Sequence, residues 1–206
     1  VVVQAMGGIM SLTGHPGGPP TRVGTSTGDI TAGLFTALGI LAALCERAQT
    51  GMGRHVDVAM LDCQVATLEN AIARYVATGE VPGPLGSRHP SITPFGLFKA
   101  RDKYLVVAAG NNPMFAALCD ALALPAAVKD DPRFQSNALR CEHHAALKVL
   151  IEAALAPRDV EEWLAHLKPL GIPTGPMNDV AAVMRDPQVL ARGSLLTLAL
   201  PNGAPF

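Results

Sequence analysis

The strongest constraint on this chain is a proline-rich segment near its middle. Residues 80–94 read EVPGPLGSRHPSITP and contain four prolines. Proline removes a backbone donor and clashes with the preceding helical turn, so no continuous helix can run through this segment. Clusters of Pro and Gly are typical of linkers between domains. We therefore expect residues 80–94 to separate two differently built units.

Before this linker the sequence predicts an order of helix, strand and helix. Residues 1–28 are rich in Gly and Pro, which predicts irregular backbone with a short helix near the start. From Ile30 the apolar residues follow a helical stripe that ends at the glycines of QTGMG. Residues 54–61, RHVDVAML, alternate as a short strand, and helical spacing returns from Asp62 until Gly79. This order indicates a parallel α/β sheet within residues 1–79.

After the linker the pattern changes to a small α+β unit at residues 95–185. FGLFKARDKYLVVAAG predicts two strands joined by a turn at Arg101–Lys103. NPMFAALCDALAL predicts a helix with Asn112 as its cap and Pro113 at its first position. The remaining expectations are helices in HHAALKVLIEAALA, VEEWLAHLKPLG, DVAAVMRD and PQVLARG, a loop in IPTGPMN, and a strand in SLLTLALPNG that enters a turn.

Composition excludes several classes of protein. The net charge is −1 and there is no basic run, which argues against binding to nucleic acid. No apolar stretch reaches the ~18 residues of a membrane span, because Thr and Gly interrupt the longest candidate, Ile30–Leu44. The four scattered cysteines form no C-x-x-C motif and predict unpaired thiols in a cytoplasmic protein. We expect no nucleic-acid partner and no membrane association.

Asp29 is the main candidate for chemistry. It stands in VGTSTGDITAGLF, directly before an apolar helix. An aspartate there is an ordinary N-cap, because its carboxylate accepts backbone N–H bonds. The same carboxylate is stabilised as an anion, its small neighbours leave room for a substrate, and a carboxylate can act as a covalent nucleophile. The spacing alone leaves both roles open.

The other polar motifs carry weaker signals. Asp57 and Asp62 are predicted to be structural. CEHH at 141–144 predicts a solvated helix start, since adjacent ligands rarely converge on one metal ion. Arg88 and His89 lie in the linker, where they are either structural or part of a cleft. No G-x-G-x-x-G, P-loop or G-x-S-x-G motif is present in a suitable context.

Several long motifs, in order and with matched spacing, resemble the class III acyl-CoA transferase family, which includes formyl-CoA transferase and carnitine CoA-transferase. The resemblance covers essentially the whole chain. It rests on QAMGGIMSLTG, GPPTRVGTSTGDITAGLFTALGILAALCERAQTGMGRHVDVAMLD, GSRHPSITPFGLFKARDKYLVVAAGN, DDPRFQSNALR, EEWLAHLKPLGIPTGPMND and DPQVLARG.

The resemblance implies a function for Asp29. The family's nucleophilic aspartate falls on Asp29, and the implied reaction moves CoA from an acyl-CoA donor to a carboxylic acid through a covalent aspartyl intermediate. Gly28, Arg88 and His89 are then expected to contact substrate. The CoA thioester is a substrate, and no permanently bound cofactor or metal is expected.

The resemblance also implies an architecture. Residues 1–79 become the C-terminal part of a Rossmann-like large domain and residues 95–185 the small domain, in an intertwined-ring homodimer. Residues 186–206 are then expected to return toward the large domain. The chain is then expected to be a fragment that lacks the N-terminal part and the C-terminal end. Two alternatives stay open: an α-methylacyl-CoA racemase-like enzyme, which would use the aspartate as an acid or base, and a non-catalytic CoA-binding paralogue.

Overall fold

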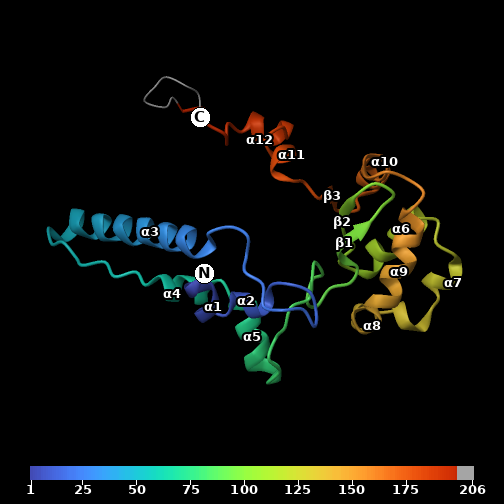
Figure 1. Ribbon diagram of the computed structural model, residues 1–206, viewed down its shortest axis with the longest axis horizontal. Coiled ribbons are helices and arrows are strands. Elements are labelled where there is room, and N and C mark those ends of the chain that lie inside the picture. The colour runs from blue at the N-terminus through green and yellow to red at the C-terminus, as the bar shows by residue number, and fades with distance from the viewer. Residues whose placement is uncertain (199–206) are drawn as a thin grey trace. The chain divides into compact units, whose positions relative to one another are not determined.

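The computed structural model describes residues 1–198 and separates into two compact units, Val1–Ser87 and Arg88–Phe206 (Figure 1). The division falls inside the segment predicted to be a linker, and residues 80–94 contain no helix or strand. Each unit is described below by itself.

All secondary-structure elements of the first unit are helices. No strand occurs in it, so the strand predicted at 54–61 is wrong: residues 53–59 are extended without a ladder partner, and Met60 already starts a helix. A strand requires a neighbouring strand to satisfy its backbone groups, and residues 1–87 supply none. The helices are α1 (Val2–Met6), α2 (Ile9–Leu12), α3 (Thr27–Thr50), α4 (Met60–Ala66) and α5 (Glu69–Thr78).

Helix α3 begins earlier than the sequence pattern indicates. Ser26 occupies the N-cap position and the helix starts at Thr27, so Asp29 lies inside the first turn and the prediction of Asp29 as N-cap is wrong. Thr and Gly are poor helix formers, which hides the first two residues of this helix from a propensity argument. The predicted end is confirmed, because Gly51 adopts a left-handed φ of 73° and its N–H binds the Arg47 carbonyl.

The single helix predicted over 62–78 is instead two helices, α4 and α5. Between them the Thr67 hydroxyl donates to the Gln64 carbonyl at 2.7 Å and accepts from Gln64 Nε2 at 2.8 Å. Local side-chain bonds of this kind compete with the helical ladder. Gly79 ends α5 as predicted, with a φ of 72°.

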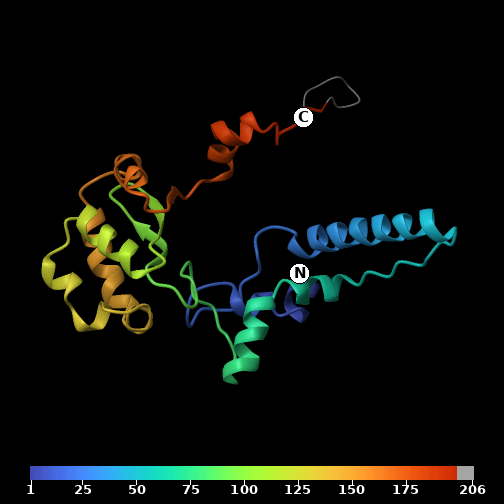
Figure 2. The ribbon, with the colours of Figure 1, turned by 180° about the vertical axis from the view of Figure 1, so that it is seen from behind.

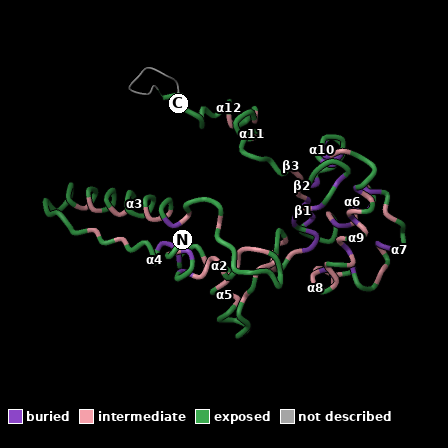
Figure 3. The backbone as a smooth tube through the Cα atoms, viewed as in Figure 1, coloured by how far each residue is buried: buried purple, intermediate pink, exposed green. Residues whose placement is uncertain are grey.

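Helix α3 exposes most of its apolar surface (Figure 3). Leu34 and Leu38 are each 62% exposed, and Ile30, Phe35, Leu41 and Leu44 are exposed as well. An 18-residue window of this helix has a mean hydropathy of 1.7, so by length and composition alone the helix could cross a membrane. This corrects the expectation that no stretch reaches that length. One such helix is weak evidence, because a core helix of a soluble protein passes the same test.

The second unit is built on a three-stranded antiparallel sheet in the order β1-β2-β3, comprising β1 (Phe95–Lys99), β2 (Tyr104–Ala108) and β3 (Thr174–Pro176). The predicted hairpin is confirmed: Phe95 pairs with Ala108 and Lys99 with Tyr104. The loop predicted at 172–178 is wrong in part. Residues 174–176 pair with β2, and Thr174 Oγ1 donates to the Val106 carbonyl at 2.6 Å.

Helices pack on this sheet and enclose the core (Figures 1 and 2). Asn111, not Asn112, caps α6, and its side chain accepts from the Met114 N–H at 2.9 Å. The helices predicted after residue 143 are found, whereas α7, η1 and α8 were not predicted. The helices are α6 (Asn112–Ala121), α7 (Ala126–Lys129), α8 (Asn137–Glu142), α9 (His144–Leu155), α10 (Val160–Leu167), α11 (Val180–Val183) and α12 (Pro187–Ala191), with 3-10 turns η1 (Pro132–Phe134) and η2 (Lys168–Leu170).

The strand predicted over 194–203 is not seen where the chain is described. Residues 194–198 form no strand, and the turn predicted at PNG lies outside the described residues.

Candidate functional site

Asp29 presents an exposed carboxylate in the first turn of α3. Among the described residues it has no hydrogen-bonding or ion-pair partner. The N–H groups of Thr27, Gly28 and Asp29 precede the first possible helical acceptor, and the Ser26 side chain makes no capping bond. The helix start therefore offers free donors and a positive dipole end beside a free carboxylate. This arrangement suits attack on an electrophilic carbonyl and stabilisation of the oxyanion that forms.

Gly28 is buried directly before this carboxylate. A Cβ atom at Gly28 would lie 2.9 Å from Val3 Cγ1 of α1, closer than side-chain carbons approach one another. A side chain at position 28 would therefore require the contact between Val3 and the start of α3 to shift. The structure supports a packing role for Gly28, and its predicted contact with substrate stays a prediction.

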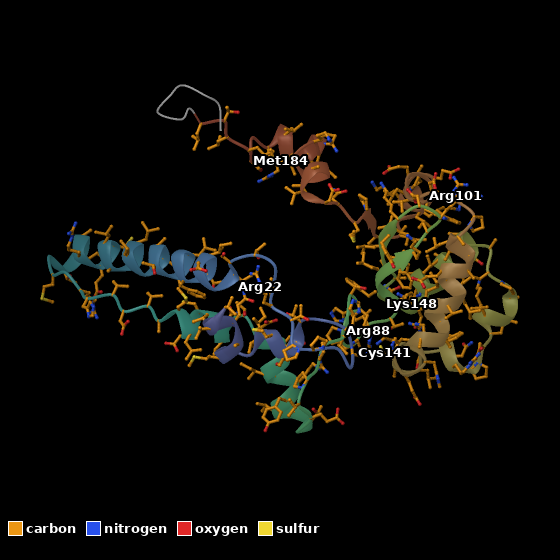
Figure 4. All side chains as sticks on the ribbon, in the orientation of Figure 1. Arg22, Arg88, Arg101, Cys141, Lys148 and Met184 are labelled. Atoms are coloured by element: carbon orange, nitrogen blue, oxygen red, sulfur yellow. The ribbon has the colours of Figure 1, made fainter. Side chains whose placement is uncertain are left out.

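Arg88 and His89 open the second unit (Figure 4 labels Arg88). Arg88 is partly exposed, and its guanidinium has no acid partner in the part of the chain that the structure describes. His89 is held locally: its N–H donates to the Phe95 carbonyl at 2.8 Å, and its Nδ1 accepts from the Ser91 N–H at 3.2 Å. The ring also packs 5.2 Å from the Phe95 ring. These contacts hold His89 within the loop, and the predicted contact of His89 with substrate stays a prediction.

Helix α8 holds the next part of this loop. Asn137 Nδ2 donates to the Ser91 carbonyl at 2.7 Å, and Asn137 Oδ1 accepts from the Thr93 N–H at 3.1 Å. Arg140 is fully buried, and its Nε donates to the Thr93 carbonyl at 2.8 Å. Burial lowers the pKa of Arg140, whose other donors reach the Phe134 carbonyl and Asn112 Oδ1. The sequence pattern alone did not single out Asn137 or Arg140.

The remaining candidates do not form a cluster. CEHH does not open one helix: Cys141 and Glu142 end α8, whereas His144 begins α9. Residues 1–198 contain no group of three or more His, Cys, Asp or Glu side chains placed to hold a metal. Asp57 and Asp62 are exposed and line a hollow of about 260 Å³ with Phe35 and Cys63. Gly28 and Asp29 adjoin in one unit, and Arg88 and His89 adjoin in the other.

The whole chain matches the model of a known protein family. The family model described as CoA-transferase family III matches residues 1–206. The chain belongs to CoA-transferase family III.

Relatives of this family-III chain include acetyl-CoA:oxalate CoA-transferase of Acetobacter aceti, which is 44% identical over 95% of the chain and 50% of its own length. Succinate--glutarate CoA-transferase of Agrobacterium fabrum is 35% identical over 98% of the chain and 50% of its own length. The family-III chain therefore spans about half the length of the curated relatives it matches.

Solved structures agree with this assignment of the family-III chain. A CAIB/BAIF family protein from Brucella suis matches with a TM-score of 0.82 and 38% identity, over 98% of this chain and 53% of that one. Rv3272 from M. tuberculosis matches with a TM-score of 0.83 and 26% identity, over 100% of this chain and 53% of that one.

Proposed function

We propose that this chain is the part of a CoA-transferase that carries the nucleophilic aspartate, Asp29. The observation that carries the proposal is a family-III sequence in which that aspartate is an exposed, unpartnered carboxylate at a helix start. The names of the relatives describe the transfer of CoA to a carboxylic acid such as oxalate or glutarate. An exposed carboxylate with free neighbouring amides has the chemistry that such a reaction needs.

The reaction proceeds by exchange at carbonyl carbons. The Asp29 carboxylate attacks the acyl-CoA thioester, which gives an acyl-aspartyl anhydride and releases the CoA thiolate. The thiolate attacks the aspartyl carbonyl, which forms the aspartyl-CoA thioester and releases the donor acid. The acceptor carboxylate attacks this thioester and expels the thiolate, leaving a second anhydride. The thiolate then attacks the acceptor's acyl carbon, forms the new acyl-CoA and regenerates Asp29.

The start of α3 contributes to each of these steps. Every attack places negative charge on a carbonyl oxygen, and a backbone N–H held in position stabilises that charge without reorganisation. The free N–H groups of Thr27, Gly28 and Asp29 are donors of this kind. Because no side chain caps the helix, these N–H groups have no bond to a capping side chain.

Arg88 is the proposed contact for the acceptor acid. Its guanidinium lacks an acid partner within residues 1–198, and a guanidinium binds a carboxylate with two parallel bonds. Oxalate and glutarate, in the names of relatives, are dicarboxylic acids. We therefore propose a small dicarboxylate as a substrate of this enzyme, with one carboxylate free to be held by Arg88.

The wider architecture follows from the family. We propose that residues 1–79 complete a Rossmann-like large domain whose other part lies in the half of the relatives' length that this chain does not span. We also propose an intertwined homodimer in the cytoplasm, with the small domain at residues 95–185 and a returning segment at 186–206.

A kinetic experiment tests the assignment of Asp29. In the full-length enzyme, Asp29→Asn and Asp29→Ala should abolish CoA exchange between donor and acceptor acids, while circular dichroism and the melting temperature stay close to wild type. Asn keeps the shape of the side chain but cannot attack a thioester. Substantial exchange by the Asn variant would contradict the nucleophile role. Racemisation of a 2-methylacyl-CoA without exchange would favour the alternative activity.

A further inference from the structure

Gln4 of α1 is a buried polar side chain, and its hydrogen-bond partners lie outside its own helix. It is 4% exposed. Gln4 Oε1 accepts from the Val23 N–H at 2.9 Å, and Gln4 Nε2 donates to the carbonyls of Thr25 at 3.2 Å and Val23 at 3.5 Å. The carboxamide of Gln4 thus binds one main-chain N–H and two main-chain carbonyls of a segment about 20 residues away. A buried amide is costly unless its groups are paired, so these bonds specify one position for the segment.

The segment that Gln4 holds leads directly into the site. Residues 23–25 are followed by the N-cap, Ser26, and Asp29 lies in the first turn after it. Val3, the neighbour of Gln4 on α1, approaches the same turn so closely that Gly28 has no room for a side chain. Helix α1 therefore contacts the start of α3 at two points, through Val3 against Gly28 and through Gln4 against residues 23–25.

Few other side chains form hydrogen bonds with this segment. The Ser26 side chain makes no capping bond, and the only other side-chain bond to residues 23–26 found in the described chain runs from Arg22 to its neighbour Val23. Two buried oxygens of the described chain, Thr27 Oγ1 in the same turn and Gln64 Oε1 beside Gly28, have no hydrogen-bond partner. Among the described residues, Gln4 is thus the side chain of another element that forms hydrogen bonds with the segment leading into α3.

We propose that Gln4 is a positioning residue for Asp29, an inference that rests on the proposed function of Asp29 as nucleophile. Gln4 fixes the segment 23–25, the segment fixes the first turn of α3, and the first turn sets the direction from which the Asp29 carboxylate meets the thioester carbonyl. Covalent catalysis depends steeply on this direction, since a displacement of about 1 Å costs on the order of a hundredfold in rate. Gln4 touches neither substrate nor reacting atoms in this role.

The test compares two side chains that form hydrogen bonds to distant main-chain atoms in the full-length enzyme. Gln4→Met keeps an unbranched side chain of similar size but removes every hydrogen bond to residues 23–25. Thr174→Val is the control, because it keeps the shape of the side chain and removes a bond within the second unit, from Thr174 Oγ1 to the Val106 carbonyl. Gln4→Glu is the second variant: it keeps an acceptor for the Val23 N–H and turns a carboxylate oxygen toward the two carbonyls.

The measurement is the single-turnover rate at which an acyl-CoA forms the aspartyl-CoA adduct, with the donor's KM and the melting temperature. Gln4→Met and Gln4→Glu should lower this rate by roughly tenfold to a hundredfold while the donor's KM stays within about twofold. Thr174→Val should keep the wild-type rate, even where its melting temperature falls as far as that of Gln4→Met.

Other outcomes overturn the proposal. A wild-type rate in Gln4→Met, an effect on KM alone, or equal rate losses in the Gln4 and Thr174 variants would each leave Gln4 a structural residue. Failure of both Gln4 variants to fold would do the same. If the wild-type enzyme transfers CoA but forms no adduct on Asp29, the proposed function fails on its own evidence and the inference about Gln4 falls with it.

Discussion

At the scale of single residues, the free guanidinium of Arg88 gives the sharpest kinetic prediction. Arg88→Ala should raise the acceptor's KM by roughly tenfold to a hundredfold, because loss of a charged hydrogen-bonding group costs about 1.5–3 kcal/mol. The donor's KM and the melting temperature should hardly change. The control is Arg185→Ala, since Arg185 is also exposed and has no acid partner among the described residues. A lowered melting temperature with unchanged acceptor kinetics would assign Arg88 to structure.

The thiol of Cys119 provides a second test at this scale. All four cysteines are free, and burial raises the pKa of Cys119 to about 11. At pH 8 the thiolate fraction of Cys119 is therefore very small. Electrophilic reagents that react with thiolates should modify Cys119 only after unfolding. Mass spectrometry of labelled peptides follows this directly. Titration of the denatured, unreduced chain should count four thiols, and a lower count would mean that a disulfide exists.

The residue scale also shows where sequence reasoning stops. The pattern singles out Asp29, because a carboxylate before an apolar helix is visible in any sequence. It misses Gln4 and Arg140, because their importance comes from main-chain atoms 19 to 47 residues away. The role of a buried polar residue can be recognised only when its environment is known. Hydrophobic periodicity carries no information about that environment.

At the scale of elements, the start of α10 predicts how stability depends on pH. Asp159 and Glu162 form a capping box, and Arg101 donates two bonds to the Asp159 carboxylate at 2.9 and 2.8 Å. The hydrogen bonds from Arg101 lower the pKa of Asp159 below its ordinary 3.8. A carboxyl group whose pKa falls on folding stabilises the fold above pH 3.8 and loses that contribution as the pH falls through its lowered pKa.

Asp159→Asn should therefore lower the urea midpoint of the second unit at pH 7, although Asn can still cap the helix. The difference from wild type should shrink as the pH falls below 3.8 and vanish once Asp159 is protonated in both states. The fluorescence of Trp163, the only tryptophan of the chain, reports this unfolding. Asp130→Asn, at an exposed carboxylate with no hydrogen-bond or ion-pair partner in residues 1–198, should hardly change the urea midpoint at either pH. A difference for Asp159→Asn that persists at low pH would exclude the ion pair as its cause.

Elements were predictable where a regular apolar pattern coincides with partners that lie within the chain. The hairpin of β1 and β2 and the helices α9 and α10 are found because their apolar faces meet in one core. β3 was missed because three residues with Gly175 and Pro176 give no alternating pattern and pair only through β2. The strand expected at 54–61 has the right alternation but no ladder partner among residues 1–87.

At the scale of the whole molecule, the two units differ in how much apolar surface they bury. Every buried apolar side chain of the described chain except Cys63 belongs to the second unit. The first unit has only α3 and short helices around a few buried groups, and α3 leaves its apolar side exposed (Figure 3). Because apolar burial is the dominant stabilising term, the units should differ greatly in their stability when separated.

Expression of the separate pieces tests this difference. Residues 88–185 should unfold cooperatively in urea and protect the amides of β2 and α9 from hydrogen exchange. Residues 1–87 alone should exchange quickly and associate through α3. A cooperative unfolding transition for residues 1–87 in monomeric form would contradict the expectation that this unit needs further chain to cover α3.

The most direct measurement of the central claim is the mass of the full-length enzyme after brief incubation with an acyl-CoA donor and no acceptor. The proposed mechanism predicts an adduct of one CoA on the peptide that contains Asp29, which disappears when the acceptor acid is added. Hydroxylamine should convert Asp29 to its hydroxamate. A CoA-transferring enzyme that carries no adduct on this peptide, or whose Asp29→Asn variant carries the same adduct, would contradict the account.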